Sequence, residues 1–268
     1  MLIRRPAVAG TFYENNPSAL KEQIAEYVNL KTETVEVKGA LIPHAGYIYS
    51  GKVAGAVYSK IKFPELFIIL CPNHTGLGEK CSIMAEGIWQ TPFGEVHIAQ
   101  SIANEILNES AYLSDNVQAH LHEHAIEVQL PFIQYFKKPF NIIPICLAID
   151  DIKALSDIGQ AIATAVKHSN KKTVIISSSD MTHYEPQEIA KEKDKTAIDA
   201  ILALDEKLLL AKIDELKISM CGYIPTAVMI IACKLLGATS AELVKYATSG
   251  DISSDYGSVV GYAGITIN

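Results

Sequence analysis

The sequence predicts an α/β fold, a single layered domain in which helices flank a central, mostly parallel or mixed sheet. Three apolar runs of strand length indicate the sheet, namely Leu66–Cys71, Asn141–Leu147 and Thr173–Ile176. Continuous apolar runs are typical of strands that are covered on both faces. Helical patterns alternate with these runs, which favours a layered α/β arrangement. The composition does not shift along the 268 residues, so we expect one domain over residues 1–268.

The expected helices are recognised by the spacing of their apolar residues. The clearest covers Asp151–His168, where Ile152, Leu155 and Ile158 recur at helical intervals. Pro225–Leu236 is apolar almost all round, so we expect this helix to be buried. The other predicted helices are Pro17–Leu30, Lys52–Ile61, Ala99–Leu107, Ala125–Phe136, Gln187–Leu204 and Glu206–Leu216.

Shorter runs complete the predicted sheet. Ala40–Pro43 is a short apolar run that ends at a histidine, and the turn Thr91–Gly94 is flanked by two short strand patterns. Two more strands are expected at the end of the sequence. These four strands are Cys81–Ala85, Val96–Ile98, Ala241–Thr248 and Ser258–Ile267.

Charge and composition exclude several classes of protein. The formal net charge is −7, which argues against a general nucleic-acid binder with its basic face. No apolar run approaches the roughly 20 residues of a membrane span, and the N-terminal residues lack the apolar stretch of a signal peptide. Five cysteines without a CxxC motif are typical of a reducing compartment. We therefore expect a cytoplasmic protein that binds neither nucleic acid nor membrane.

Polar side chains that can bind ligands follow three of the predicted strands. His44 comes directly after Ala40–Pro43, His74 follows Leu66–Cys71, and Asp180 with His183 follows Thr173–Ile176. In open α/β sheets, ligands bind beyond the carboxyl ends of the strands. The pattern therefore predicts a site there. The alternative is that each histidine is a hydrogen-bonded core residue and that the serines before Asp180 cap a helix.

A second cluster of histidines lies between His120 and Glu127. It is not the HExxH motif of zinc proteases, because Ile126 occupies the position of the second histidine. In an extended conformation His120, His122 and His124 share a face, whereas a helix starting near Glu123 would place His124 and Glu127 on one face. The alternative is a partly exposed capping cluster. His97 and His168 are expected at the surface.

The cysteines divide into core residues and one candidate ligand. Cys71, Cys146 and Cys233 lie inside apolar runs and are expected in the core, and Cys81 opens a predicted strand. Cys221 lies in a turn just before the buried helix. A thiolate near a helix N-terminus is stabilised by the helix dipole, so it can be a nucleophile or a metal ligand. A structural role is the alternative.

Taken together, these residues resemble the MEMO family. The matching stretches occur in order over nearly the whole chain and are Arg5–Tyr13, Pro43–Tyr47, Pro72–His74, Thr91–Gly94, Glu123–Pro131, Ser178–His183 and Cys221–Gly222. The resemblance implies a fold similar to class III extradiol dioxygenases, whose iron is held by two histidines and a glutamate. It implies that His44 and His74 are metal ligands and that Cys221 stands where the glutamate would be. It also implies that His124, Asp180 and His183 line the same pocket in catalytic roles. AMMECR1-like and radical-SAM proteins are the partners that the resemblance implies.

Cys221 decides which metal and which chemistry are expected. Two histidines and a carboxylate suit iron(II), whereas a thiolate makes copper and zinc plausible beside iron. We therefore expect a metal-dependent oxidoreductase, dioxygenase-like in its chemistry, that acts on an unknown small molecule. One alternative is a non-catalytic module that binds a peptide or a protein through a vestigial site. Another is a cysteine hydrolase or transferase with Cys221 as nucleophile.

Overall fold

The centre of the protein is a twelve-stranded mixed sheet. The computed structural model describes residues 2–136 and 139–268, and strand order along the sheet is β1-β5-β6-β8-β3-β9-β2-β12-β10. β11 pairs with β12, and β4 joins β7 to β8. The strands are β1 Ile3–Arg4, β2 Gly39–Ile42, β3 Leu66–Pro72, β4 Cys81–Ile83, β5 Ile88–Thr91, β6 Gly94–Ile98, β7 Ser114–Asp115, β8 Asn141–Leu147, β9 Thr173–Ser178, β10 His183–Glu185, β11 Ala241–Thr248 and β12 Val259–Ile267.

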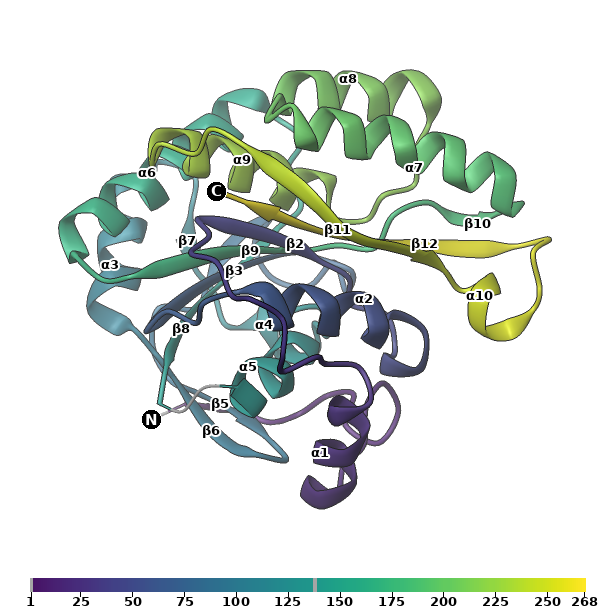
Figure 1. The fold of residues 1–268 in the computed structure, drawn as a ribbon. Helices are drawn as coiled ribbons and strands as arrows, with labels where there is room; N and C mark the ends of the chain where they lie inside the picture. Colours follow the sequence, from purple (N-terminus) through teal and green to yellow (C-terminus); the bar gives the residue numbers. More distant parts are fainter. Residues whose placement is uncertain (1, 137–138) are drawn as a thin grey trace.

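The middle of the sheet is parallel. β8, β3, β9 and β2 are neighbours in that order, and each pair runs in the same direction, so the carboxyl ends of the four strands meet at one edge. β12 runs antiparallel to β2, which makes the whole sheet mixed. The arrangement confirms the predicted α/β class with a mixed sheet flanked by helices (Figure 1).

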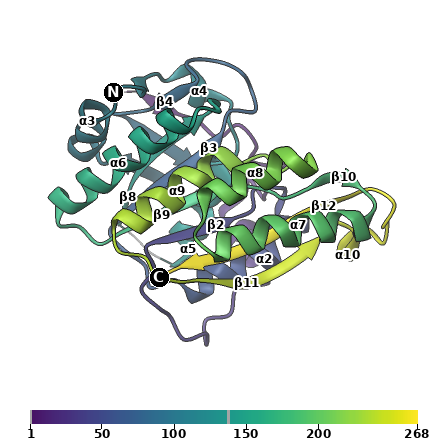
Figure 2. The same cartoon turned by 90° about the horizontal axis from the view of Figure 1, so that it is seen from above.

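Helices cover both faces of the sheet. α3, α6, α9, α8 and α7 pack on one another in that order, and α9 lies directly against β2, β3 and β9 (Figure 2). α2 packs on β2, β11 and β12 from the other side, together with α5 and α1. The helices are α1 Pro17–Ala25, α2 Tyr47–Lys60, α3 Gln100–Glu109, α4 Gln118–Leu121, α5 Leu130–Phe136, α6 Ile152–Ser169, α7 Gln187–Leu202, α8 Glu206–Leu216, α9 Tyr223–Leu235 and α10 Gly250–Ser253.

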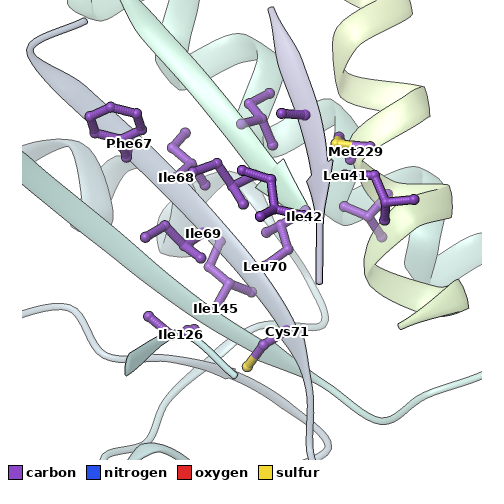
Figure 3. Close-up of a cluster of buried hydrophobic side chains, with 14 of the residues drawn as sticks. Leu41, Ile42, Phe67, Ile68, Ile69, Leu70, Cys71, Ile126, Ile145 and Met229 are labelled. Atoms are coloured by element: carbon purple, nitrogen blue, oxygen red, sulfur yellow. The ribbon is translucent and has the colours of Figure 1, made fainter. Parts of the chain in front are cut away.

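The core surrounds β3, in which every residue is buried. Figure 3 shows side chains of this strand among those of β2, β8 and α9, the labelled members being Leu41, Ile42, Phe67, Ile68, Ile69, Leu70, Cys71, Ile145 and Met229. Burying an aliphatic side chain of this size contributes about 1.5–3 kcal/mol. The packing therefore makes a rigid base for the residues that follow the strands.

Several predicted boundaries are wrong, and the causes are local. The helix expected over Ala125–Phe136 is a 3₁₀ turn at Glu127–Gln129 followed by α5, because Pro131 is accommodated in the first turn of a helix and not in its interior. α1 ends at Ala25 and not at Leu30. β9 runs on through Ser178, since its residues stay in register with β2. No helix in the described residues is long and apolar enough to cross a bilayer.

Candidate metal centre

Three residues that come from distant parts of the chain meet at the carboxyl edge of the parallel strands. His44 follows β2, His74 follows β3, and Cys221 lies just before α9. One ligand atom from each of the three lies within 4.8 Å of the others. Cys221 Sγ is 3.3 Å from His44 Nε2, and the rings of His44 and His74 are 5.1 Å apart. The strand order explains this meeting, because β9 lies between β3 and β2 and all three strands end on one side.

Hydrogen bonds determine which nitrogen of His44 carries the proton. The Ser178 hydroxyl donates to the carbonyl of Ala125 at 2.7 Å and accepts from Gln129 Nε2 at 2.8 Å. Its single proton is therefore already used, so His44 Nδ1 must donate in the 3.1 Å contact with Ser178 Oγ. The lone pair of His44 is then on Nε2, the nitrogen beside Cys221 Sγ.

A carboxylate that the sequence did not reveal as functional lies behind His74. The Glu123 side chain is completely buried and accepts from the backbone N–H of His74 at 2.7 Å and from His74 Nδ1 at 2.9 Å. Burial opposes ionisation of Glu123, but the hydrogen bond and charge of His74 outweigh it and hold the pKa at about 2. Burial likewise opposes protonation of His74, yet Glu123 raises its pKa above the usual value.

The other ionisable groups of the site are shifted mainly by burial. Burial, followed by the nearby His74, lowers the pKa of His44 to about 3, and burial followed by His44 lowers that of His124 to about 4. Both are therefore neutral near pH 7, the form that binds metals. Burial and then the Asp180 charge raise the pKa of the Cys221 thiol. The helix start favours the thiolate, but burial and then the charge of Asp180 outweigh this effect in the protein without metal.

Asp180 and His183 hold defined positions beside these residues. Asp180 Oδ1 accepts from the backbone N–H of His44 at 2.8 Å and of Ala45 at 3.3 Å, while Oδ2 is 4.0 Å from His44 Nε2. His183 Nδ1 donates to the carbonyl of Ser219 at 2.9 Å, which leaves a lone pair on Nε2. His183 begins the short strand β10, which the sequence did not predict.

The six predicted site residues line one cavity of about 480 Å³, and these are His44, His74, His124, Asp180, His183 and Cys221. The ring of His124 stacks on that of His74 at 4.8 Å and meets that of His44 edge-on at 5.3 Å. Phe12 and Tyr184 also line the cavity, and the Tyr184 side chain is exposed.

The remaining residues of the histidine cluster are elsewhere. His120 is completely buried next to Trp89, and His122 is exposed. Glu127 is buried too and pairs with Arg4, so the interpretation of a partly exposed capping cluster is wrong for His120 and Glu127. A buried pair of this kind gives no sequence signal, because both partners resemble surface residues. His97 and His168 are exposed, as predicted.

Comparison with known proteins places the whole chain in one family. Residues 4–266 match the sequence profile described as Memo-like protein. The chain belongs to the Memo family. It is 43% identical to a MEMO1 family protein of Methanothermobacter thermautotrophicus over 274 residues, covering 98% of this chain and 99% of the relative. A Memo family relative from Aquifex aeolicus is 41% identical, with 99% of each chain covered.

A solved structure shares the overall fold of this chain. The crystal structure of the uncharacterized protein JW3007 from Escherichia coli K12 superimposes with a TM-score of 0.57 at 10% identity, covering 87% of this chain and 100% of that one. At this identity the likeness concerns the fold alone.

The donor set fits a transition metal. Two imidazole nitrogens and one sulfur converge, and the cavity leaves one side of them open. Imidazole and thiolate together suit zinc, copper and iron, whereas magnesium and calcium prefer oxygen ligands. Thiol and imidazole protons would have to leave when a metal binds, which makes binding depend on pH.

Proposed function

We propose that this Memo family protein binds one transition-metal ion through His44, His74 and Cys221 and uses it in an oxidoreductase reaction on a small molecule. The observation that carries the proposal is the convergence of three ligand atoms within 4.8 Å at the floor of an open cavity. Four-coordinate sites with three protein ligands and one open position are typical of catalytic centres, whereas structural sites are closed.

When bound, iron or copper supplies redox chemistry, and zinc supplies Lewis acidity. The protein's own residues provide the proton chemistry around it. The neutral form of His183 has its lone pair on Nε2, and the imidazole of His124 is neutral near pH 7, so an imidazole of the cavity can accept a proton from a bound molecule. Asp180 holds the turn that carries His44.

Metal content is the direct test of this proposal. The protein would be purified without oxygen, loaded with iron(II), copper(I) or zinc in turn, and passed over a desalting column before metal analysis. We expect close to one ion per chain in the wild type and a large loss in His44→Ala and Cys221→Ser. His97→Ala is the matched control, since His97 is exposed on β6 outside the cavity. Equal metal content in all four proteins would refute the proposal.

A second candidate function is a non-catalytic module that binds a peptide or a partner protein. Tyr184 favours it, because this side chain is 78% exposed beside the cavity, and exposed aromatic residues are enriched at protein interfaces. AMMECR1-like and radical-SAM proteins are the partners to try in a pull-down with wild type and Tyr184→Ala. Capture that persists in chelator and is lost in Tyr184→Ala would favour this function over the metal-dependent one.

The cysteine hydrolase alternative has less support. The Cys221 thiol is buried, its pKa is raised, and its nearest imidazole is the candidate metal ligand His44. A nucleophilic cysteine needs a lowered pKa or a base that is free to take its proton. We therefore do not assign Cys221 a nucleophilic role.

A further inference from the structure

His44 and His74 differ in how firmly packing holds them. The His44 side chain is 3% exposed, so the surrounding side chains fix its ring. The His74 side chain is 32% exposed and lies in a loop that continues into Thr75 and Gly76. An exposed ring on a loop keeps rotational freedom unless a specific hydrogen bond restrains it. His74 therefore needs a partner that His44 does not.

Glu123 supplies this restraint at two points. One carboxylate oxygen accepts from the backbone N–H of His74 at 2.7 Å, and the other accepts from Nδ1 at 2.9 Å. The first contact fixes the loop, and the second fixes the rotation of the ring. Since a carboxylate only accepts, Nδ1 is the donor, and Nε2 is the nitrogen that remains for a ligand bond.

Glu123 is itself held in place by buried groups. Its Oε1 also accepts from the backbone N–H of Ala125 at 2.9 Å, and its backbone carbonyl accepts from the Arg4 guanidinium at 2.6 Å. Arg4 is completely buried; it donates to the carbonyl of His120 at 3.1 Å and forms an ion pair with Glu127. The segment that carries Glu123 is thus fastened to the N-terminal strand β1.

From these contacts we infer that Glu123 is a positioning residue, which orients the His74 ring and keeps its proton on Nδ1 so that Nε2 faces His44 and Cys221. Carboxylates behind a metal-binding histidine have this effect and make the imidazole a better donor. The expected effect of Glu123 on metal affinity rests on the proposed function. The claim that Glu123 keeps the His74 proton on Nδ1 concerns the protein without metal, so it can be tested even if the proposed function fails.

Glu123→Gln keeps the size of the side chain but removes its negative charge and one of its two acceptor oxygens. The two carboxylate oxygens accept from three N–H groups, two on His74 and one on Ala125. An amide has a single acceptor oxygen, so its NH₂ group must face at least one of these donors. If the NH₂ takes the position of Oε1, it faces Nδ1 of the His74 ring, and the ring relieves the conflict by moving its proton to Nε2, which removes the lone pair from the side of the ligands. If the NH₂ takes the position of Oε2, it faces the backbone N–H of His74 and the loop loses its restraint.

Two measurements test the inference. Nitrogen-15 NMR of metal-free protein, at a pH above the pKa of His74, reports which ring nitrogen is protonated. We expect Nδ1–H in the wild type and a shift toward Nε2–H in Glu123→Gln. Competition with a chromophoric zinc chelator gives metal affinity, and we expect Glu123→Gln to lower it about 10–100-fold. Urea unfolding of the metal-free proteins measures the structural cost separately.

Glu127→Gln is the matched control. Glu127 is also completely buried and accepts from Arg4, Ala7, Val8 and Tyr13, but it does not contact His74. We expect this variant to lose stability while its zinc affinity and His74 tautomer stay as in the wild type.

Equal loss of affinity in both variants would overturn the inference, as would an Nε2–H tautomer in the wild type. If the wild type binds no zinc, the proposed function fails, and the tautomer still decides the role of Glu123. If Glu123→Gln does not fold, the wild-type tautomer provides the test.

Discussion

Gly222 allows Cys221 to lie close to the end of β9. A Cβ atom at this position would be 2.5 Å from Ser179 Cβ, 2.7 Å from Ser179 Oγ and 2.8 Å from the carbonyl oxygen of Ser178. Its φ is not positive, so an alanine is excluded by contacts and not by backbone conformation. The Gly222→Ala variant therefore forces the start of α9 away from Ser178 and Ser179, which lead into Asp180.

The size of the effect follows from these contacts. Carbon atoms prefer a separation of about 3.5–4.0 Å, so the helix start must retreat by about 1 Å. Overpacking of this kind costs about 1–3 kcal/mol. The 2.9 Å hydrogen bond from the backbone N–H of Gly222 to Ser179 Oγ would also be weakened, which adds about 0.5–1.5 kcal/mol. We expect a total loss of about 2–4 kcal/mol, and at least a tenfold loss of metal affinity, on the order of what supporting residues contribute.

Urea unfolding of the metal-free protein and chelator competition measure the two losses. Gly46→Ala is the matched control, because Gly46 lines the same cavity, while its nearest neighbours are 3.7 and 3.8 Å from an added Cβ. Gly46 precedes α2 as its N-cap, so alanine there costs at most about 1 kcal/mol. Equal destabilisation by the two substitutions, or wild-type stability of Gly222→Ala, would refute the steric reasoning.

Three further predictions concern residues outside the ligand set. Tyr184 has a φ of 60°, a conformation that strains residues other than glycine. Tyr184→Gly should therefore raise the free energy of unfolding by about 0.5–1 kcal/mol, because the relief of about 1–2 kcal/mol exceeds the entropic cost of glycine. A lower midpoint in urea unfolding would contradict this. Burial and then Arg4 lower the pKa of His120 to about 3. Below pH 6.5 the unfolded chain therefore binds a proton on this histidine that the folded chain does not bind. As a result, the free energy of unfolding falls as the pH drops from 6.5 toward 3. Between pH 6.5 and 5 the wild type should lose about 1.6 kcal/mol more than His120→Leu, and parallel pH profiles would argue against this expectation. Arg4→Ala leaves the buried Glu127 carboxylate without its partner and should cost about 3–5 kcal/mol, and a loss below about 1 kcal/mol would show that the pair is dispensable.

The sequence predicted those parts of the fold and site that depend on local pattern. Asn141–Leu147 and Glu206–Leu216 have the predicted bounds, because continuous burial and helical periodicity are each visible in a single segment. Ala241–Thr248 also has the predicted bounds, although most of its residues are not buried. His44, His74 and Asp180 were found because each follows a buried strand. In a parallel sheet, that position alone brings such residues to one edge.

What the sequence could not predict depends on contacts between distant residues. Glu123 and His74 are 49 positions apart, and a glutamate beside histidines has the pattern of a solvated helix start. Arg4 near the N-terminus likewise resembles a surface residue until the fold surrounds it. For Cys221 only the helix start is visible in the sequence, whereas its burial and the nearby Asp180, which follows β9, become visible only in the fold. Strands as short as β1, β7 and β10 have no measurable periodicity.

The burial of Arg4 has a consequence for how the chain is made. Arg4 is synthesised 123 residues before its partner Glu127, and β1 pairs with β5, which is also made later. During translation β1 can meet β5 once residue 91 has left the ribosome, but the guanidinium of Arg4 meets its buried partner only after residue 127 has done so. A stalled or shortened chain that stops before Glu127 would keep its N-terminal segment accessible to proteases, while a chain that extends past α5 would protect it.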